Sequence, residues 1–166
     1  MSVSYRNVVF GVGSNLRGRL RNLREAVEKL ARSGFNIEIK SNVFETEPWG
    51  FKDQPPFLNA CVKAGIDKDL LSPVEILGII KKIESDMGRE ESFRYAPRII
   101  DIDLLLVDSI IYEDELLSVP HKEIYNRAFV LYPLLEVYPG WIHPISGESV
   151  NKAAVKYERP VRVVKL

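Results

Sequence analysis

The segment RIIDIDLLLV, residues 98–107, restricts the fold of this chain more than any other stretch. It has the length and apolar composition of a buried β-strand, yet it contains Asp101 and Asp103. Burying a carboxylate costs free energy unless a cation or hydrogen bonds meet it. Side chains two apart on a strand share a face, so both aspartates point one way and the opposite face is predicted to enter the core. The predicted core positions are Ile100, Ile102, Leu104 and Leu106.

The order of the other segments predicts a ferredoxin-like α+β fold. Strands, helices and turn residues alternate as β-α-β-β-α-β, which is the signature of that motif. A hairpin at 109–119, a helix over 126–137 and an irregular tail are expected to extend it. The expected core elements are a strand at 7–13, a helix at 16–33, strands at 35–46 and 57–66, a helix at 72–88 and the strand at 98–107. The helix at 72–88 is expected to begin with a capping box of Ser72 and Glu75 and to present Val74, Leu77, Ile80 and Ile83 on one face.

Length and composition narrow the function classes. The 166 residues suit a single domain over 1–166, and Lys plus Arg (23) balance Asp plus Glu (23). Without a basic field, a general nucleic-acid binder is disfavoured. One cysteine excludes an intramolecular disulfide and a Cys-based zinc site. Neither a signal peptide nor an apolar run of membrane-spanning length is found, so a cytoplasmic protein without membrane contact is expected.

The aspartate pair suits Mg²⁺, which takes oxygen ligands and keeps waters and phosphate oxygens as the rest. One alternative is that both carboxylates are solvated on an exposed face, and another is that they pair with Arg98. Arg89, Arg94 and Arg98 lie on the loop just before the strand, and arginine binds phosphate bidentately. The combination favours a metal-bound polyphosphate.

The loop ETEPWGFKDQPP and the strand after it offer a different chemistry. Thr46 and Asn59 carry hydrogen-bonding groups, while Trp49 and Phe57 offer flat apolar area, a mixture that suits a planar heterocycle. The alternative is that Phe57 belongs to the core and Trp49 anchors the loop. In GVGSNL, residues 11–16, a tight turn at Gly13–Asn15 is expected to border the site.

Five ordered motifs identify the chain as similar to the 6-hydroxymethyl-7,8-dihydropterin pyrophosphokinases of folate biosynthesis. They are GSNL, F-x-T-x-P-x-G-x-x-D-Q-P-x-F-L-N, IE-x-x-x-GR, R-Y-A-P-R-I-I-D-I-D-L-L and VPH-x-x-x-x-NR-x-F, and they span roughly residues 7–145. The resemblance implies a ferredoxin-like enzyme that transfers the pyrophosphoryl group of ATP to the pterin hydroxymethyl oxygen and releases AMP, using two Mg²⁺.

The resemblance also implies roles for individual residues. Asp101 and Asp103 match the metal-bridging carboxylates and, with Arg89 and Arg98, form the expected catalytic set. The expected pterin site comprises Thr46, Glu47, Trp49, Phe57, Asn59 and Phe129, with Phe57 and Phe129 stacking on the ring. The expected ATP site comprises Lys81, Glu84, Arg94, Tyr95, Arg98, Leu104, His121 and Arg127.

Some positions depart from the family pattern. Lys81 stands where a glutamine is common, Lys122 where a tyrosine often follows the histidine, and the loop after Arg89 is about one residue shorter. A rival interpretation is a non-catalytic ferredoxin-like ligand-binding module, and a second is an RNA-binding module, which would need exposed aromatics in a basic field. A monomer acting on small molecules is expected, with association with a neighbouring folate-pathway enzyme left open.

Overall fold

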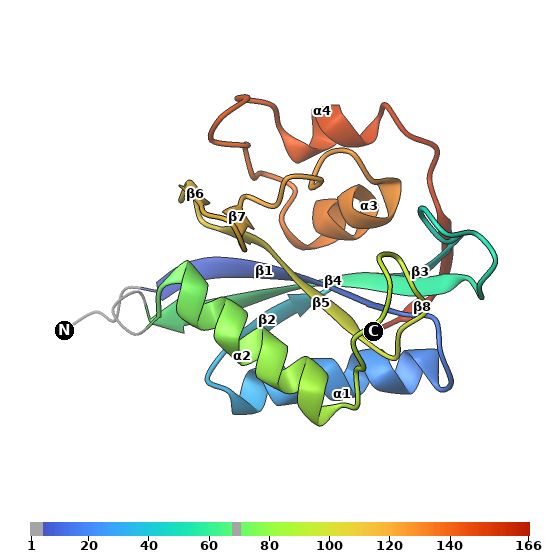
Figure 1. Ribbon diagram of the computed structural model, residues 1–166. Helices are drawn as coiled ribbons and strands as arrows, with labels where there is room; N and C mark the ends of the chain where they lie inside the picture. Colours follow the sequence, from blue (N-terminus) through green and yellow to red (C-terminus); the bar gives the residue numbers. More distant parts are fainter. Residues whose placement is uncertain (1–4, 68–70) are drawn as a thin grey trace.

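The computed structural model describes residues 5–67 and 71–166, and a six-stranded antiparallel sheet runs through the middle of it (Figure 1). The strands are β1 (Tyr5–Ser14), β2 (Asn36–Lys40), β3 (Asn42–Thr46), β4 (Phe57–Asp67), β5 (Asp101–Val107) and β8 (Val161–Lys165), with a small hairpin of β6 (Tyr112–Glu113) and β7 (Ser118–Val119). The helices are α1 (Arg19–Arg32), α2 (Pro73–Asp86), α3 (Ala128–Val137) and α4 (Val150–Ala154).

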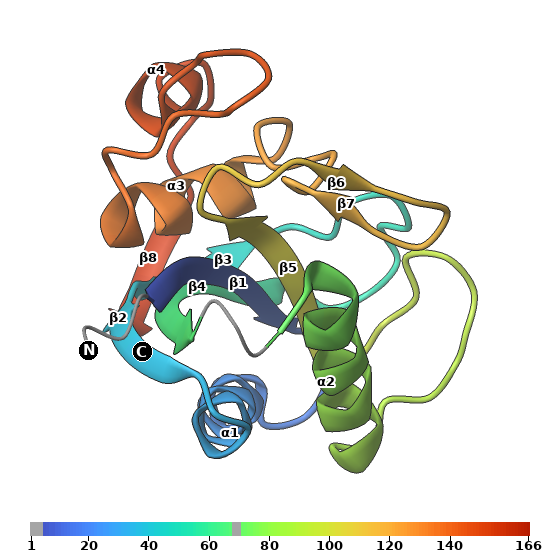
Figure 2. The same cartoon turned by 90° about the vertical axis from the view of Figure 1, so that its left-hand side faces the viewer.

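Helices cover both faces of the sheet, as Figures 1 and 2 show. On one face α1 and α2 bury Leu23, Leu30, Ile76 and Ile80 in the larger core cluster. On the other face α3 and α4 form a second cluster around Leu131. The sheet order β5-β1-β4-β3 with its α1 and α2 crossovers confirms the predicted ferredoxin-like α+β fold.

The start of α2 follows its sequence signals closely. The Ser72 N–H donates to Glu75 Oε2 (2.7 Å) and the Glu75 N–H donates to Ser72 Oγ (3.3 Å), which is the capping box that the sequence predicts. Ile80 and Ile83 are buried as expected, whereas Val74 is 47% exposed, and Pro73 and Ile76 are buried in place of Val74 and Leu77. The first helical turn therefore faces the core one position away from the expected stripe.

The second predicted strand, 35–46, is two strands. Both β2 and β3 pair with β4, and the chain is interrupted at Ser41. The buried Ser41 exchanges hydrogen bonds with Cys61, through its N–H to the Cys61 carbonyl (2.9 Å) and from the Cys61 N–H to its hydroxyl (2.9 Å). A side-chain oxygen thus substitutes for a backbone partner where the ladder is irregular.

A bulge in β5 changes one predicted core position. Val9 pairs with Leu106 and Phe10 pairs with Leu104, so Leu105 is the extra residue. Ile102 and Leu104 enter the core beside α1 and α2 as predicted, but Leu106 packs with Leu105 in the cluster beneath α3. The prediction that Leu106 shares the face of Leu104 is therefore wrong, because alternation holds only up to the bulge.

The prediction of an irregular tail after residue 137 is wrong. The tail contains α4 and then β8, which pairs antiparallel with β3 and covers that edge of the sheet. The hairpin predicted at 109–119 is confirmed as β6 and β7. Within residues 5–67 and 71–166, no helix combines the length and the apolar character needed to cross a membrane.

Candidate active site

The floor of the candidate active site is one face of the sheet, where β5, β1 and β4 lie side by side. Asp101 of β5 lies opposite Gly13 of β1, and Gly13 lies opposite Asn59 of β4. In the neighbouring row Asp103 lies opposite Gly11. Because residues two apart share a face, the carboxylates and the Asn59 amide stand on the same face, separated by glycines. Gly13 and Ser14 thus end a strand, whereas the sequence had indicated a turn at 13–15.

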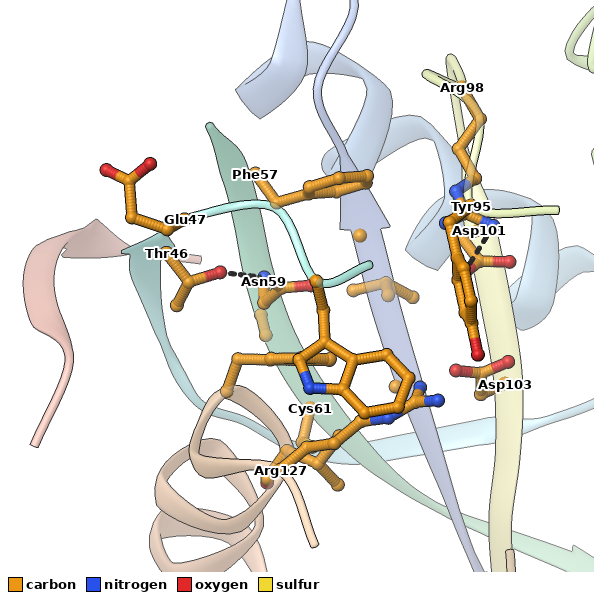
Figure 3. Close-up of a pocket in the computed structure, with 17 residues that line it drawn as sticks. Thr46, Glu47, Phe57, Asn59, Cys61, Tyr95, Arg98, Asp101, Asp103 and Arg127 are labelled. Carbon is orange, nitrogen blue, oxygen red and sulfur yellow. Dashed lines mark hydrogen bonds and ion pairs between the residues drawn. The ribbon is translucent and has the colours of Figure 1, made fainter. Parts of the chain in front are cut away.

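A pocket above this floor brings most of the predicted residues together (Figure 3). A second groove beside it is lined by Lys81, Glu84 and Arg89, and Arg98 lines both hollows. Predicted site residues in the pocket are Thr46, Glu47, Trp49, Phe57, Asn59, Tyr95, Arg98, Asp101, Asp103, Arg127 and Phe129.

Thr46 and Asn59 form a polar pair at one end of the pocket. The Asn59 Nδ2 donates to Thr46 Oγ1 at 2.7 Å, as the dashed line in Figure 3 marks. This bond leaves the Thr46 hydroxyl proton to donate and the Asn59 Oδ1 to accept. Phe57, 9% exposed, lies on the same strand as Asn59, so flat apolar area and a donor and acceptor are presented together.

The two aspartates have different surroundings. Asp101 is held by Arg89 at 2.7 Å and by Arg98 at 3.6 Å. Within the described ranges no ion pair or hydrogen bond reaches the Asp103 carboxylate. Burial and then the charge of Asp101 raise the pKa of the Asp103 carboxyl from 3.8 to about 7, against the opposing charge of Arg127. The sequence alternative of pairing with Arg98 therefore holds for Asp101 only.

Beneath Asp101 a buried carboxylate holds the structure together. Glu84, 3% exposed, accepts from the Ile102 N–H at 2.8 Å, and it also accepts from Arg89. Arg89 thus lies between Glu84 and Asp101 and joins α2 to β5. Lys81 contacts the other carboxylate oxygen of Glu84, Oε2, at 3.2 Å. The positions of the Asp101 and Arg89 side chains therefore depend on a buried carboxylate that lines the groove.

Two arginines in the pocket lack a full set of partners. In the part of the chain that the structure describes, the buried Nε atoms of Arg98 and Arg127 have no hydrogen-bond acceptor. The Arg127 guanidinium lies 4.3 Å from the Trp49 ring centroid and 5.6 Å from that of Phe129. Guanidinium groups with free donors beside a carboxylate pair are suited to bind an anion such as a polyphosphate.

Two loops form the mouth of the pocket and contact each other. The rings of Trp49 and Tyr95 are packed edge to face with their centroids 5.3 Å apart. Phe51 and Phe93 are packed in the same way, also with a centroid distance of 5.3 Å. The Gln54 side chain donates to the Tyr95 carbonyl at 2.8 Å. Trp49 is therefore a loop anchor, as one interpretation of the sequence had it, and it also lines the pocket.

Three predicted ATP-site residues line neither hollow. The Leu104 side chain is buried in the core, so it is not available to contact a ligand. The Arg94 guanidinium lies over the Tyr95 ring at 4.8 Å. His121 accepts the Glu123 N–H at Nδ1 (3.1 Å), and burial together with the charge of Arg127 lowers its pKa. Lys122, where a tyrosine is common, pairs with Glu113 at 3.3 Å.

Asn15 is a site residue whose role the sequence did not indicate. Its side chain donates to Gln54 at 2.8 Å and accepts the Arg98 N–H at 2.9 Å. It therefore ties the end of β1 to both loops. The signal was present, since GSNL is one family motif and D-Q-P lies within another, but a contact between the two motifs could not be inferred without the fold.

Comparison with known sequences places the chain among pyrophosphokinases. The family 7,8-dihydro-6-hydroxymethylpterin-pyrophosphokinase (HPPK) matches residues 9–139. The 2-amino-4-hydroxy-6-hydroxymethyldihydropteridine pyrophosphokinase of Aquifex aeolicus is 45% identical over 87% of this chain and 88% of its own length. The protein of the same name from Methylorubrum extorquens is 40% identical over 89% of this chain and 91% of its own.

Other relatives are longer proteins. The mitochondrial folate synthesis bifunctional protein of Pisum sativum is 41% identical over 78% of this chain, which spans 25% of that protein. A crystal structure of a Plasmodium falciparum HPPK-DHPS triple mutant with pteroate superposes with a TM-score of 0.70 at 16% identity, over 93% of this chain and 43% of that one. The structural likeness supports the fold, and the sequence matches establish that this chain belongs to the 7,8-dihydro-6-hydroxymethylpterin-pyrophosphokinase family of folate biosynthesis.

Proposed function

We propose that the chain transfers the pyrophosphoryl group of ATP to the hydroxymethyl oxygen of 6-hydroxymethyl-7,8-dihydropterin, releasing AMP, with two Mg²⁺ held by Asp101 and Asp103. Family membership supplies the reaction. The observation that carries the residue assignments is a single pocket that contains the carboxylate pair, two arginines with free donors, two phenylalanines and an Asn-Thr pair.

The dihydropterin is assigned to the end of the pocket that holds Thr46 and Asn59. Its ring would stack between Phe57 and Phe129, while Asn59 Oδ1 accepts from a ring N–H and the Thr46 hydroxyl donates to the ring edge. Backbone groups of Glu47 and Trp49 would complete that edge. The guanidinium of Arg98 is 5.5 Å from the Phe57 ring, so stacking and phosphate binding would adjoin.

The residues fit Mg²⁺. Within the described residues, no cluster of three or more His, Cys, Asp or Glu side chains could hold a metal unaided. Two carboxylates on one face suit an ion that takes its remaining ligands from water and phosphate. When bound, Mg²⁺ would neutralise phosphate charge and make the acceptor alcohol more acidic. Among the described residues the Asp103 carboxylate has no ion-pair or hydrogen-bond partner, so it would be available to a bound cation.

ATP is assigned to the side of the carboxylates where the pocket meets the second groove. Arg98 and Arg127 would neutralise the transferred phosphates. Arg89 would hold Asp101 in place, and Glu84 would hold Arg89, through the Arg89–Asp101 and Arg89–Glu84 ion pairs. Further proposed ATP contacts come from α2, from the loop before β5, and from β5 and the segment after it, namely Lys81, Arg94, Tyr95, Leu104 through its main chain, and His121.

In the reaction, the pterin oxygen forms a bond to the β-phosphorus of ATP. The bond from that phosphorus to the oxygen bridging the α-phosphorus breaks, AMP leaves with that oxygen, and the alcohol proton is released. Such transfers depend on positioning and charge neutralisation more than on covalent help. The aromatic pair would orient the alcohol, the arginines would bind the phosphates, and the contacting loops at Trp49 and Tyr95 would exclude water.

An assay of AMP formation tests the function. Purified protein with ATP, Mg²⁺ and hydroxymethyl-dihydropterin should form AMP and the pterin diphosphate in equal amounts. Chelation with EDTA should stop the reaction and added Mg²⁺ should restore it. ADP as the product, or turnover that is indifferent to EDTA, would contradict the proposal.

The stacking assignment predicts that Phe57→Ala and Phe129→Ala weaken dihydropterin binding roughly tenfold or more, since an aromatic pair contributes about 0.5–1.5 kcal/mol beyond area burial. Phe57→Tyr keeps the ring face and should bind nearly as wild type. Calorimetry with a non-hydrolysable ATP analogue and Mg²⁺ measures the affinities. Unchanged affinity in both alanine variants would exclude the stacking.

The proposal includes cytoplasmic action on small molecules by one domain over residues 1–166. Longer relatives, such as the bifunctional protein of Pisum sativum, combine folate synthesis activities in one chain. Association of this chain with a neighbouring folate-pathway enzyme is therefore part of the proposal.

A further inference from the structure

We infer that Gly13 is a positioning residue for pterin recognition, because the absence of a side chain there leaves the space that the Asn59 amide occupies. The inference rests on the proposed function in one respect, namely that Asn59 contacts the pterin. The orientation of the Asn59 amide is a property of the ligand-free protein and does not depend on the proposed function.

The close approach is local and specific. A Cβ atom built on Gly13 would lie 2.7 Å from Asn59 Oδ1, a distance that real Cβ atoms essentially never show. The next nearest atoms, Asn59 Cγ and the Leu58 carbonyl oxygen, are each 3.8 Å away, so no other side chain is displaced. Asn59 and Gly13 are register partners in β4 and β1, which explains the contact.

Backbone conformation does not account for glycine at this position. The glycines with positive φ among the described residues are Gly18, Gly34, Gly50, Gly88 and Gly147, and Gly13 is not one of them. It lies in a strand between Val12 and Ser14, where glycine is intrinsically unfavourable. Space above the strand is therefore the property that a side chain would remove.

Asn59 occupies that space in a defined orientation. With Nδ2 bonded to Thr46 Oγ1 at 2.7 Å, its Oδ1 points toward Gly13 along the floor of the pocket. The amide would thus offer its acceptor, and the threonine its donor, to one edge of a heterocycle. A methyl group at position 13 would push the flexible end of Asn59 away, so that the Thr46 bond and the acceptor direction change together while the strand remains.

The first measurement compares the affinities of Gly13→Ala for dihydropterin and for an ATP analogue with those of the wild-type protein. Dihydropterin affinity should fall roughly tenfold to hundredfold, the range for loss of a hydrogen bond with its partner left unpaired, and affinity for an ATP analogue without pterin should change less than twofold. The same substitution in an Asn59→Ala background should have no further effect, because the atom that it displaces is absent.

Gly11→Ala is the matched control. It lies two residues earlier on the same strand, and the three atoms nearest to its Cβ would all belong to Leu105, the first of them Cδ1 at 3.4 Å. Its effect on affinity should be the same with and without Asn59. In ligand-free protein, the Asn59 side-chain amide resonance should shift in Gly13→Ala and stay in place in Gly11→Ala.

The outcomes separate this inference from the proposed function. If Asn59→Ala weakens pterin binding but Gly13→Ala does not, or weakens it equally without Asn59, the inference is overturned. If the amide resonance shifts as expected while Asn59→Ala leaves pterin affinity unchanged, the positioning geometry holds and the pterin assignment fails. An unshifted amide resonance in folded Gly13→Ala also overturns the inference.

Discussion

Asp101→Ala and Asp103→Ala should each lower kcat/KM by roughly 10²- to 10³-fold or more, the range for loss of one group that stabilises transition-state charge. Both carboxylates stand on the pocket floor, where each would hold the metal ions. Steady-state kinetics at saturating Mg²⁺ measures the loss. Near-normal activity in either variant would make the metal assignment wrong.

Measurements of stability distinguish the loss of a metal ligand from damage to the fold. Because the pKa of Asp103 is raised from 3.8 to about 7, the folded metal-free protein favours the protonated form. Its stability should therefore fall as pH rises between about 4 and 7, and the full penalty applies above 7. Asp103→Asn should remove that dependence, so the metal-free variant should match or exceed wild type in urea unfolding at pH 8. A variant less stable than wild type at pH 8 would show that the carboxylate supports the fold.

Glu84→Ala should cause the second large loss, in stability as well as in activity. Glu84 is 3% exposed and accepts both the Ile102 N–H and the Arg89 guanidinium. Its removal leaves a buried N–H unpaired and Arg89 without its inner partner. We expect about 2–4 kcal/mol of destabilisation, below the value for a fully buried pair because Arg89 is partly exposed. Turnover should also fall, because Arg89 would no longer hold Asp101 at its present position.

Two variants control for this prediction. Glu84→Gln keeps an acceptor for the Ile102 N–H but loses the charge, so it should be intermediate in stability. Lys82→Ala removes an exposed pair with Asp86 on the same helix, which water and salt screen, and should change stability far less than Glu84→Ala does. If chemical denaturation gives Glu84→Ala the same stability as Lys82→Ala, the buried carboxylate does not have the role assigned to it.

Local signals in the sequence predicted the elements that depend on near neighbours. The capping box at Ser72 and Glu75 formed as predicted because its partners are three residues apart. The shared face of Asp101 and Asp103 followed from the strand period, which both residues obey. The β-α-β-β-α-β order and the family motifs were sufficient for fold and reaction class.

Signals failed where a distant partner decides the outcome. Leu106 changes face because a bulge opposite Val9 and Phe10 inserts Leu105 into the strand. The predicted strand 35–46 is divided because Ser41 bonds to Cys61 on a strand that comes later in the chain. The tail forms β8 because β3 leaves an unpaired edge, which the tail's own pattern does not reveal.

The sequence specifies which chemical groups this protein has: two carboxylates two apart, arginines on the loop before them, and the aromatic and amide residues of the pterin motif. How these groups are paired depends on the fold. Arg89 lies between Glu84 and Asp101, Asn59 fills the space above Gly13, and in the part of the chain that the structure describes the Asp103 carboxylate has no ion-pair or hydrogen-bond partner. Those relations depend on sheet register and helix docking, which join residues far apart in the chain, and no local pattern encodes such distances.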